Sequence, residues 1–350
     1  MPSALITGVA GQTGSFLAEE LLDRDYEVYG MIRRTSSPNT ERIEQTLKHP
    51  LFTLVHGDMN DQGSLSGLVN KIRPTEVYNL AAQSHVHTSW AEPVATGEVN
   101  AMGAIRLLEA LRQNAPEARF YQASSSEMFG RVRERPQTEK TPFHPRSPYG
   151  VAKCYAHYAT VNYRESYGMF ASCGIAFNHE SERRSPEFVT RKITQAVARI
   201  CAGLQDRITL GDLTPMRDWG YARDYARAMI TILAAPMASD YVIATGETHR
   251  VQDFVQIAFS SVGLNWQEYV VRDETLVRPA EVDYLCGDAQ RLGALGWRPT
   301  TGFVDLVRHM LRHDLMRLGW GPERAQELVC DLHERPETAS PPRSQLKLVQ

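Results

Sequence analysis

The chain has 350 residues, with 38 Lys and Arg against 41 Asp and Glu and a formal net charge of −3. This length allows a sizeable core, and the near balance of charge excludes the basic surface of a nucleic-acid-binding protein as the main function. No apolar run reaches the roughly 20 residues that span a bilayer, and Met1–Gly8 has the pattern of a strand instead of a signal peptide. We therefore expect a cytoplasmic protein without nucleic-acid or membrane partners.

Apolar runs and helical patterns alternate through the first half of the chain. Strands are predicted at Ala4–Thr7, Tyr26–Ile32, Phe52–His56, Glu76–Leu80, Ala118–Gln122 and Phe170–Phe177. Helices are predicted at Gln12–Leu22, Thr40–Leu47, Gln62–Lys71, Thr96–Arg112 and Ser147–Tyr167. The alternation predicts an α/β fold with a doubly wound parallel sheet of the Rossmann type, whose ligands bind at the carboxyl ends of the strands.

Beyond Phe177 the regular alternation stops. Helical stretches follow near Val189–Leu204, Asp218–Ala235, Val251–Val262 and Leu292–Leu315, with a strand near Asp240–Thr245. We expect residues 1–180 and 212–247 to form the Rossmann domain. Residues 181–211 and 248–320 would form a smaller, mostly helical α/β domain that binds the substrate. Residues 321–350 are polar and rich in Pro, which predicts a loosely ordered tail.

Cysteine and histidine do not indicate a metal centre. The five cysteines are widely spaced and contain no C-x-x-C pair, so we expect reduced, mostly buried thiols. His85 and His87 would share one face of a strand, but no third ligand lies near them in the sequence. No metal is expected.

A glycine-rich loop follows the first predicted strand and opens a helix. Its sequence is Gly8-Val9-Ala10-Gly11-Gln12-Thr13-Gly14. Glycine permits a tight turn and close approach of the backbone to a pyrophosphate, which the N-terminus of the helix stabilises. This position indicates a dinucleotide cofactor, although a glycine-rich turn alone is often only a turn.

The end of the second strand favours NADP over NAD. NAD-binding proteins usually place a carboxylate there for the ribose 2′-hydroxyl, whereas this chain has Arg33-Arg34-Thr35-Ser36. Guanidinium groups and hydroxyls suit a 2′-phosphate. Without the glycine loop, solvated charges after a strand would be the preferred interpretation. Asp58, after the third strand, could accept a hydrogen bond from the adenine amino group.

Tyr149 and Lys153 form a Y-x-x-x-K pair near the start of the long helix at Ser147–Tyr167. Residues four apart share one helix face, and an ammonium beside a phenol favours the phenolate. We expect Lys153 to lower the pKa of Tyr149, so that the phenolate takes a hydroxyl proton while hydride leaves the same carbon.

Ser124-Ser125-Ser126-Glu127 follows the fifth predicted strand. A hydroxyl there can bond the substrate oxygen that Tyr149 deprotonates. Glu127 adds a carboxylate that a simple dehydrogenase does not need: beside a 4-keto sugar it could remove the C5 proton and protonate the departing C6 hydroxyl. A surface carboxylate at a helix start is the alternative interpretation.

With these motifs assembled, residues 3–317 resemble the GDP-mannose 4,6-dehydratases of the extended short-chain dehydrogenase/reductase class. The resemblance rests on blocks at Thr7–Gly14, Arg33–Ser37, Asn79–Val86, Arg146–Lys153, Phe177–Arg184, Phe188–Ile193, Arg217–Gly220 and Arg278–Asp283. It implies an NADP-dependent lyase that converts GDP-mannose to GDP-4-keto-6-deoxymannose and water.

The resemblance also assigns site residues. Ser125 would polarise the sugar O4, Glu127 would be the dehydration acid and base, Tyr149 the base of the hydride step, and Lys153 its partner on the nicotinamide ribose. Cofactor contacts would fall on Gly8, Val9, Ala10, Gly11, Gln12, Thr13, Arg33, Arg34, Thr35, Ser36, Asp58, Met59, Leu80, Ala81, Ala82, Gln83, Ser84, Lys153, His179 and Arg184. Substrate contacts would fall on Ser84, Ser125, Glu127, Tyr149, Asn178, Val189, Lys192, Leu210, Gly211, Arg217, Arg278 and Glu281.

Four positions depart from the family pattern. Ser125 stands where Thr is usual, Gly150 where Ala is usual, Ala95 where Tyr is usual and Glu182 where Pro is usual. The Ser125 hydroxyl preserves the chemistry, whereas Ala95 removes a cofactor contact. In the family the loop after the second strand helps to build a tetramer, so Arg33–Ser37 predicts a homo-oligomer, either a dimer or a tetramer.

Three alternative functions stay open at this point. The preferred sugar could be another GDP-sugar such as a heptose. An NADP-dependent epimerase or reductase would share the fold, Tyr149 and Lys153, but has no need of Glu127 as an acid and base. A non-catalytic protein on the same fold would not need the complete set of Ser125, Glu127, Tyr149 and Lys153.

Overall fold

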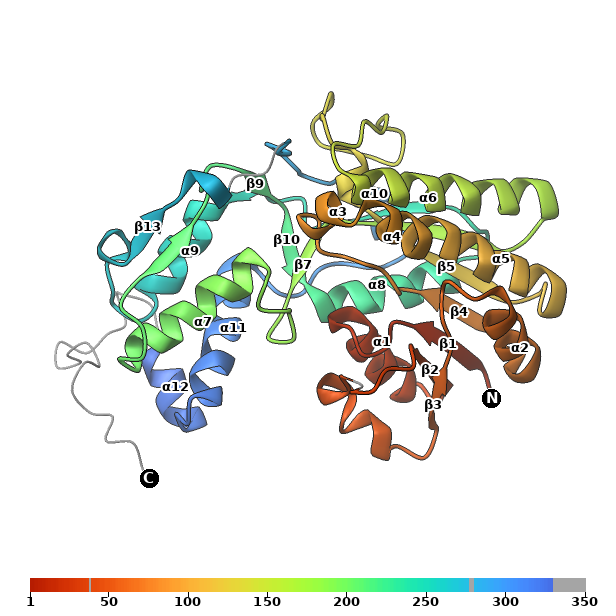
Figure 1. The fold of residues 1–350 in the computed structure, drawn as a ribbon, viewed down its shortest axis with the longest axis horizontal. Coiled ribbons are helices and arrows are strands. Elements are labelled where there is room, and N and C mark those ends of the chain that lie inside the picture. Colours follow the sequence, from red (N-terminus) through yellow and green to blue (C-terminus); the bar gives the residue numbers. More distant parts are fainter. Residues whose placement is uncertain (38, 277–279, 330–350) are drawn as a thin grey trace.

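The computed structural model describes residues 1–329 except 38 and 277–279, and it divides into a large sheet domain and a smaller lobe (Figure 1). Within these residues, seven parallel strands form one sheet in the order β11-β6-β5-β4-β1-β2-β3. The strands are β1 (Ser3–Thr7), β2 (Glu27–Ile32), β3 (Phe52–His56), β4 (Glu76–Asn79), β5 (Arg119–Ser125), β6 (Ala171–Ala176) and β11 (Asp240–Ile243). The chain reverses direction across the sheet between β1 and β4, confirming the predicted doubly wound α/β class.

Helices cover both faces of the sheet because alternate strand residues point to opposite sides. Ala4 and Ile6 pack with α1 (Gln12–Leu22) and α8 (Ala222–Ala234), whereas Leu5 packs with the helices of the other face. Those helices are α2 (Gln62–Ile72), α5 (Gly103–Asn114) and α6 (Pro148–Tyr167). Each fully buried Leu, Ile or Phe contributes about 1.5–3 kcal/mol, so strands covered on both faces are mostly apolar. The buried polar residues Thr7, Asn79 and Gln122 hydrogen-bond to one another across β1, β4 and β5.

Local sequence signals set the ends of α6, which carries Tyr149 and Lys153. The Ser147 hydroxyl caps the helix by accepting from the Gly150 amide at 3.0 Å, and Pro148 occupies the first turn. Gly168 ends the helix in the left-handed region at φ 66°, where a side chain would be strained. The predicted span of Ser147–Tyr167 is confirmed.

The smaller lobe has its own core. It contains α7 (Val189–Cys201), α9 (Val251–Ser260), α11 (Phe303–Arg317) and α12 (Pro322–Leu328) around the parallel pair β8 (Ile208–Leu210) and β13 (Val270–Arg272). Two more pairs, β7 (Asn178–Glu180) with β10 (Trp219–Tyr221) and β9 (Met216–Arg217) with β12 (His249–Arg250), lie between the lobes. The short helices are α3 (Thr88–Ala91), α4 (Pro93–Gly97) and α10 (Gln290–Gly293). The proposed domain boundaries stay predictions.

Several predicted elements differ from the structure. The helix expected at Thr40–Leu47 is two short 3₁₀ turns, Glu41–Ile43 and Thr46–Lys48, because the chain must turn into β3 and Pro50 cannot continue a helix. The helix expected at Thr96–Arg112 begins at Pro93 and passes through a π-helical turn at Glu98–Met102 before α5. His87 precedes a helical turn, so the two histidines do not share a strand.

The tail predicted from residue 321 also differs in its first part. Pro322 begins α12, and Ala325 and Val329, four residues apart, are buried in the core of the smaller lobe. The rest of the predicted tail, residues 330–350, lies outside the described residues. Among the helices that the structure describes, none is long and apolar enough to cross a bilayer.

Candidate active site

A cavity of about 710 Å³ opens at the carboxyl ends of β1, β4, β5 and β6 and extends to the smaller lobe. Its walls contain most of the residues singled out from the sequence. These are Gly8, Gly11, Gln12, Thr13, Leu80, Ala81, Ala82, Ser84, Ser125, Glu127, Tyr149, Lys153, Asn178, His179, Arg184, Val189, Lys192, Leu210, Gly211, Arg217 and Glu281. The fold therefore brings catalytic, cofactor and substrate candidates to one space.

The remaining candidates do not line this cavity. Val9 and Ala10 belong to the glycine loop, and Gln83 lies between two lining residues, Ala82 and Ser84. Arg33, Arg34, Thr35 and Ser36 are exposed after β2, while Asp58 and Met59 follow β3. Strands β2 and β3 lie next to β1 in the sheet, so the residues that follow them lie beside the glycine loop. An adenosine attached to a pyrophosphate on that loop would extend towards them. Arg278 lies outside the described residues.

The glycine loop fits a dinucleotide. Gly8 adopts a left-handed φ of 71°, and a Cβ there would lie 2.9 Å from the Ala81 amide nitrogen. A Cβ on Gly14 would overlap the Gly8 carbonyl oxygen. Helix α1 begins at Gln12 without a side chain capping its first turn, so its amides remain to bind an anion. The loop is thus shaped for a pyrophosphate.

His179 supports the glycine loop from β7. Its Nδ1 lies 2.8 Å from the Phe177 carbonyl and must donate, so its Nε2 accepts from the Thr13 hydroxyl at 2.9 Å. The ring stacks on Tyr225 with centroids 4.6 Å apart. Burial lowers the pKa of His179 to about 4, so the imidazole is neutral at physiological pH and orients Thr13.

Tyr149 is buried against Ser125 and Glu127. Burial raises the pKa of Tyr149 to about 12, a hydrogen bond with Ser125 opposes this rise, and the charge of Glu127 adds to it. The expectation that Lys153 lowers the pKa of Tyr149 is wrong, because the pKa is raised and Lys153 is not among its causes. The Lys153 ammonium lies 5.7 Å from the centroid of the phenol ring and donates to the Ala123 carbonyl at 2.9 Å. Burial also lowers the pKa of Lys153 to about 8, so the side chain is still mostly a charged ammonium at neutral pH.

Glu127 lies on a 3₁₀ turn, Ser126–Met128, directly after β5. The strand extends to Ser125, three residues beyond the predicted Gln122, and the Ser125 hydroxyl accepts from the Glu127 amide at 3.2 Å. A Cβ on Gly150 would lie 2.8 Å from the Glu127 carbonyl oxygen. Gly150, which departs from the family pattern, therefore lets α6 pack closely against the 3₁₀ turn that carries Glu127.

The smaller lobe contributes a polar end of the cavity. Arg217 donates to Glu281 at 2.8 Å, and the Lys192 ammonium donates to the Thr209 carbonyl at 2.7 Å. The side-chain oxygen of Asn178 is buried without a hydrogen-bond partner, so a ligand donor would relieve its desolvation. Guanidinium and ammonium groups suit phosphate oxygens.

Other residues of the cavity wall had no cofactor or substrate role assigned from the sequence. His85, Glu187 and Phe188 line it, and the Arg184 guanidinium lies over the Phe188 ring, 3.4 Å from its centroid. Arg184 also forms an ion pair with Glu180 at 3.1 Å. The only sequence signal for a site role of these residues was their place inside or beside the family-like blocks at Asn79–Val86 and Phe188–Ile193.

Comparisons with known proteins agree with this geometry. A family model described as GDP-mannose 4,6 dehydratase matches residues 5–310. GDP-mannose 4,6 dehydratase 2 of Arabidopsis thaliana is 51% identical over 89% of this chain and 86% of its own length. The human GDP-mannose 4,6 dehydratase is 44% identical over 91% of this chain and 93% of its own length.

The chain belongs to the GDP-mannose 4,6-dehydratase family. Its fold also matches the dTDP-glucose 4,6-dehydratase DesIV of Streptomyces venezuelae, solved with NAD and TYD bound. The TM-score is 0.81 and the identity 26%, over 91% of this chain and 98% of that one. A Thermus thermophilus UDP-glucose 4-epimerase in complex with NAD has a TM-score of 0.78 and 28% identity over 89% of this chain and 98% of that chain.

The structure also places the two other residues that depart from the GDP-mannose 4,6-dehydratase pattern. Ala95 is exposed on α4 and does not line the cavity. Glu182 accepts from His309 of α11 at 3.0 Å, and its carbonyl accepts from Arg191 of α7. A proline has no side chain that could accept from His309. Glu182 therefore adds a hydrogen bond between the loop after β7 and helix α11.

Proposed function

We propose that this chain is an NADP-dependent GDP-mannose 4,6-dehydratase that forms GDP-4-keto-6-deoxymannose and water. The observation that carries the proposal is the convergence of Ser125, Glu127, Tyr149 and Lys153 on one cavity beside the glycine loop. Membership of the dehydratase family supports the same reaction.

Tyr149 and Ser125 act on the sugar C4 hydroxyl. The Ser125 hydroxyl binds O4, and the phenolate of Tyr149 takes the O4 proton as the C4 carbonyl forms. Because burial raises the pKa of Tyr149 to about 12, the phenolate needs nearby positive charge. The cationic nicotinamide of bound NADP would supply this charge, and Lys153 would hold the ribose of that nicotinamide.

Glu127 carries out the elimination. A C4 carbonyl makes the C5 proton acidic, and the Glu127 carboxylate removes it. The same group then delivers the proton to the C6 hydroxyl, which leaves as water. Tyr149 returns its proton to C5, so the phenolate is restored. A single carboxylate thus acts first as base and then as acid.

NADP would be held by the glycine loop, with its 2′-phosphate on Arg33, Arg34, Thr35 and Ser36 and its adenine near Asp58. When bound, it supplies the acceptor for the C4 hydride and returns that hydride to C6. The overlap that a Cβ on Gly14 would make with the Gly8 carbonyl supports a loop on which the start of α1 packs closely. Leu80–Ser84, after β4, would form the opposite wall.

The GDP-sugar would extend from the catalytic residues into the smaller lobe. Arg217 and Lys192, which line the cavity, would neutralise a diphosphate, and the buried Asn178 amide oxygen has no hydrogen-bond partner within the described residues. Leu210 and Gly211 would flank the nucleotide. Arg278 is retained as a proposed diphosphate contact on the basis of sequence alone.

The function is tested by incubating the purified protein with NADP and a panel of nucleotide sugars. We expect GDP-mannose to lose the mass of one water molecule, without net consumption of cofactor. A faster reaction with a GDP-heptose would identify that sugar as the preferred substrate. An isomer of unchanged mass would identify an epimerase, and a reduced product with spent NADPH would identify a reductase.

Arg33 is expected to select NADP over NAD. Arg33→Ala should weaken NADP binding by about tenfold or more, since a guanidinium–phosphate pair is charge-assisted and often bidentate, and should leave NAD binding unchanged. The measurement is the dissociation constant of each cofactor by calorimetry, with Lys48→Ala, at an exposed lysine of the 3₁₀ turn before β3, as the charge control. Equal affinity of the unaltered protein for NAD and NADP would refute the proposed preference for NADP.

We also propose a cytoplasmic homo-oligomer. The cysteines within the described residues, Cys154, Cys173, Cys201 and Cys286, are free, which suits a reducing compartment. Val151, Tyr155 and Tyr158 form an exposed stripe on α6, at 56%, 49% and 59% exposure. Trp90 of α3 and Val94 of α4 are also exposed on helices that pack against α6. A contiguous apolar face of this kind suits a second copy of the chain.

A further inference from the structure

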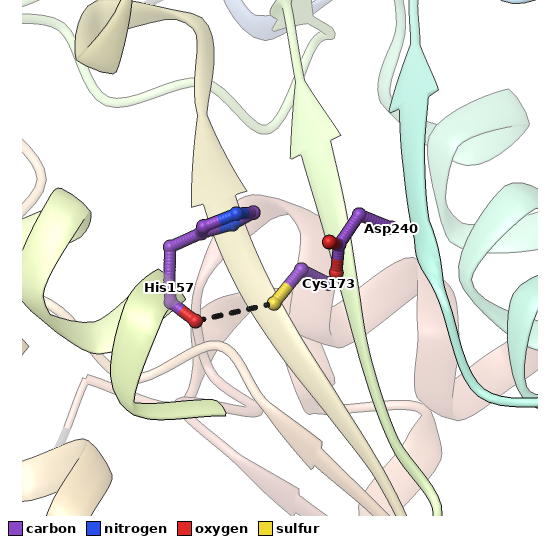
Figure 2. Close-up of side chains that lie close together, drawn as sticks. All are labelled: His157, Cys173 and Asp240. Carbon is purple, nitrogen blue, oxygen red and sulfur yellow. Dashed lines mark hydrogen bonds between the residues drawn. The ribbon is translucent and has the colours of Figure 1, made fainter. Parts of the chain in front are cut away.

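A polar cluster lies between helix α6 and strands β6 and β11, with two of its three residues buried and Asp240 half-buried. His157 of α6, Cys173 of β6 and Asp240 of β11 bring one ligand atom each to within 4.8 Å of one another (Figure 2). Figure 2 shows the three side chains converging from the helix and from two neighbouring strands. Neither the cofactor nor the substrate is assigned to this place, so the cluster needs its own explanation.

The contacts of the cluster do not favour a metal ion. Arg164 holds both carboxylate oxygens of Asp240, at 3.0 and 3.1 Å. Burial raises the pKa of the Cys173 thiol well above its usual value, so it stays protonated and donates to the His157 carbonyl. A divalent cation would have to displace a guanidinium and deprotonate this thiol.

His157 instead reaches towards the active site. Its Nδ1 lies 3.0 Å from the Ser124 hydroxyl, and both residues are almost fully buried. The ring is held edge-on by Phe143 and Tyr158, with centroids 5.1 and 5.5 Å away. Its orientation is therefore fixed by packing as well as by the hydrogen bond.

This bond joins α6 to β5, as do the Tyr149–Ser125 bond described above and a bond from Lys153. Lys153 donates to the Ala123 carbonyl, and His157, one helical turn later, bonds the next residue, Ser124. Ser125 follows on the strand, and Tyr149 precedes Lys153 by one turn on the helix. These bonds together set the register between the helix that carries the phenol and the strand that carries the hydroxyl.

We infer that His157 is a positioning residue of the dehydratase. Through Ser124 it holds the end of β5 against α6, so that Ser125 and Tyr149 address the same sugar oxygen. The Cys173 thiol donates to the His157 carbonyl, and Asp240, which is paired with Arg164, lies beside both residues. The role assumes the reaction proposed above, and it predicts an effect on turnover more than on binding.

The test compares Ser124→Ala, His157→Leu and the double variant with the unaltered protein. Each single change should lower kcat about tenfold or more, with the KM for GDP-mannose and the NADP dissociation constant within about twofold. The double variant should lose no more than the worse single variant, because both changes remove one bond. His157→Asn, which can place a polar atom near the Nδ1 position, should recover part of the turnover.

Thr160→Ala is the matched control. Thr160 is buried on the same helix, but its hydroxyl donates to the Ala156 carbonyl within α6. Its kcat should stay within about twofold of the unaltered protein. Additive losses, equal losses of kcat and cofactor affinity, or unchanged turnover in Ser124→Ala would overturn the role of His157. If the unaltered protein itself converts no GDP-mannose, the proposed function fails instead.

Discussion

Glu127→Gln is expected to bind NADP and GDP-mannose normally and to release almost no 6-deoxy product. The amide has the shape of the carboxylate but can neither take the C5 proton nor deliver it to the C6 hydroxyl. General acid–base groups contribute about 10²–10⁴-fold, so product formation should fall by at least the lower figure. The first hydride step does not need Glu127, so the variant should accumulate reduced cofactor in a single turnover.

The measurement is product mass together with the absorbance of the reduced nicotinamide. Glu187→Gln is the matched control, since Glu187 is an exposed carboxylate on the rim of the same cavity. It should keep its turnover, which separates loss of one charge from loss of the acid and base. Undiminished 6-deoxy product from Glu127→Gln would remove this residue from the mechanism.

The sheet domain was predictable because its signals are local. Apolar runs such as Phe52–His56 match β3 residue for residue, and Ser147 with Pro148 marks the start of α6. A strand needs apolar residues on the faces that it buries, and a helix start needs a cap, so each signal appears within a few residues of sequence. The glycine loop was recognisable for the same reason.

The contacts that organise the site were not predictable in this way. Thr13 and His179 are 166 residues apart, and Glu182 and His309 are 127 apart. Such pairs depend on how segments far apart in the chain pack together, and nothing in the local sequence specifies them. His157 could be placed on a helix, but its bond to Ser124 follows only from the packing of α6 on β5.

The environment of Tyr149 also had to come from the structure. The Y-x-x-x-K spacing correctly places both side chains on one helix face, yet spacing carries no information about desolvation. Burial is the largest influence on the phenol and raises its pKa, while Lys153 is directed to the Ala123 carbonyl. The phenol is therefore mostly protonated near neutral pH unless the bound cofactor supplies positive charge.

Tyr149→Phe is accordingly expected to lower kcat by about 10²-fold or more and to leave NADP affinity unchanged. The ring still fills its buried position, so the fold is preserved, but no group remains to take the O4 proton. In the unaltered protein kcat should rise with pH as the phenol loses its proton, whereas the residual rate of the variant should not follow that ionisation. Initial rates across the pH range, beside Tyr155→Phe on the exposed face of α6, make the comparison. A near-normal rate in Tyr149→Phe, or an unchanged pH profile, would mean that another group takes the proton.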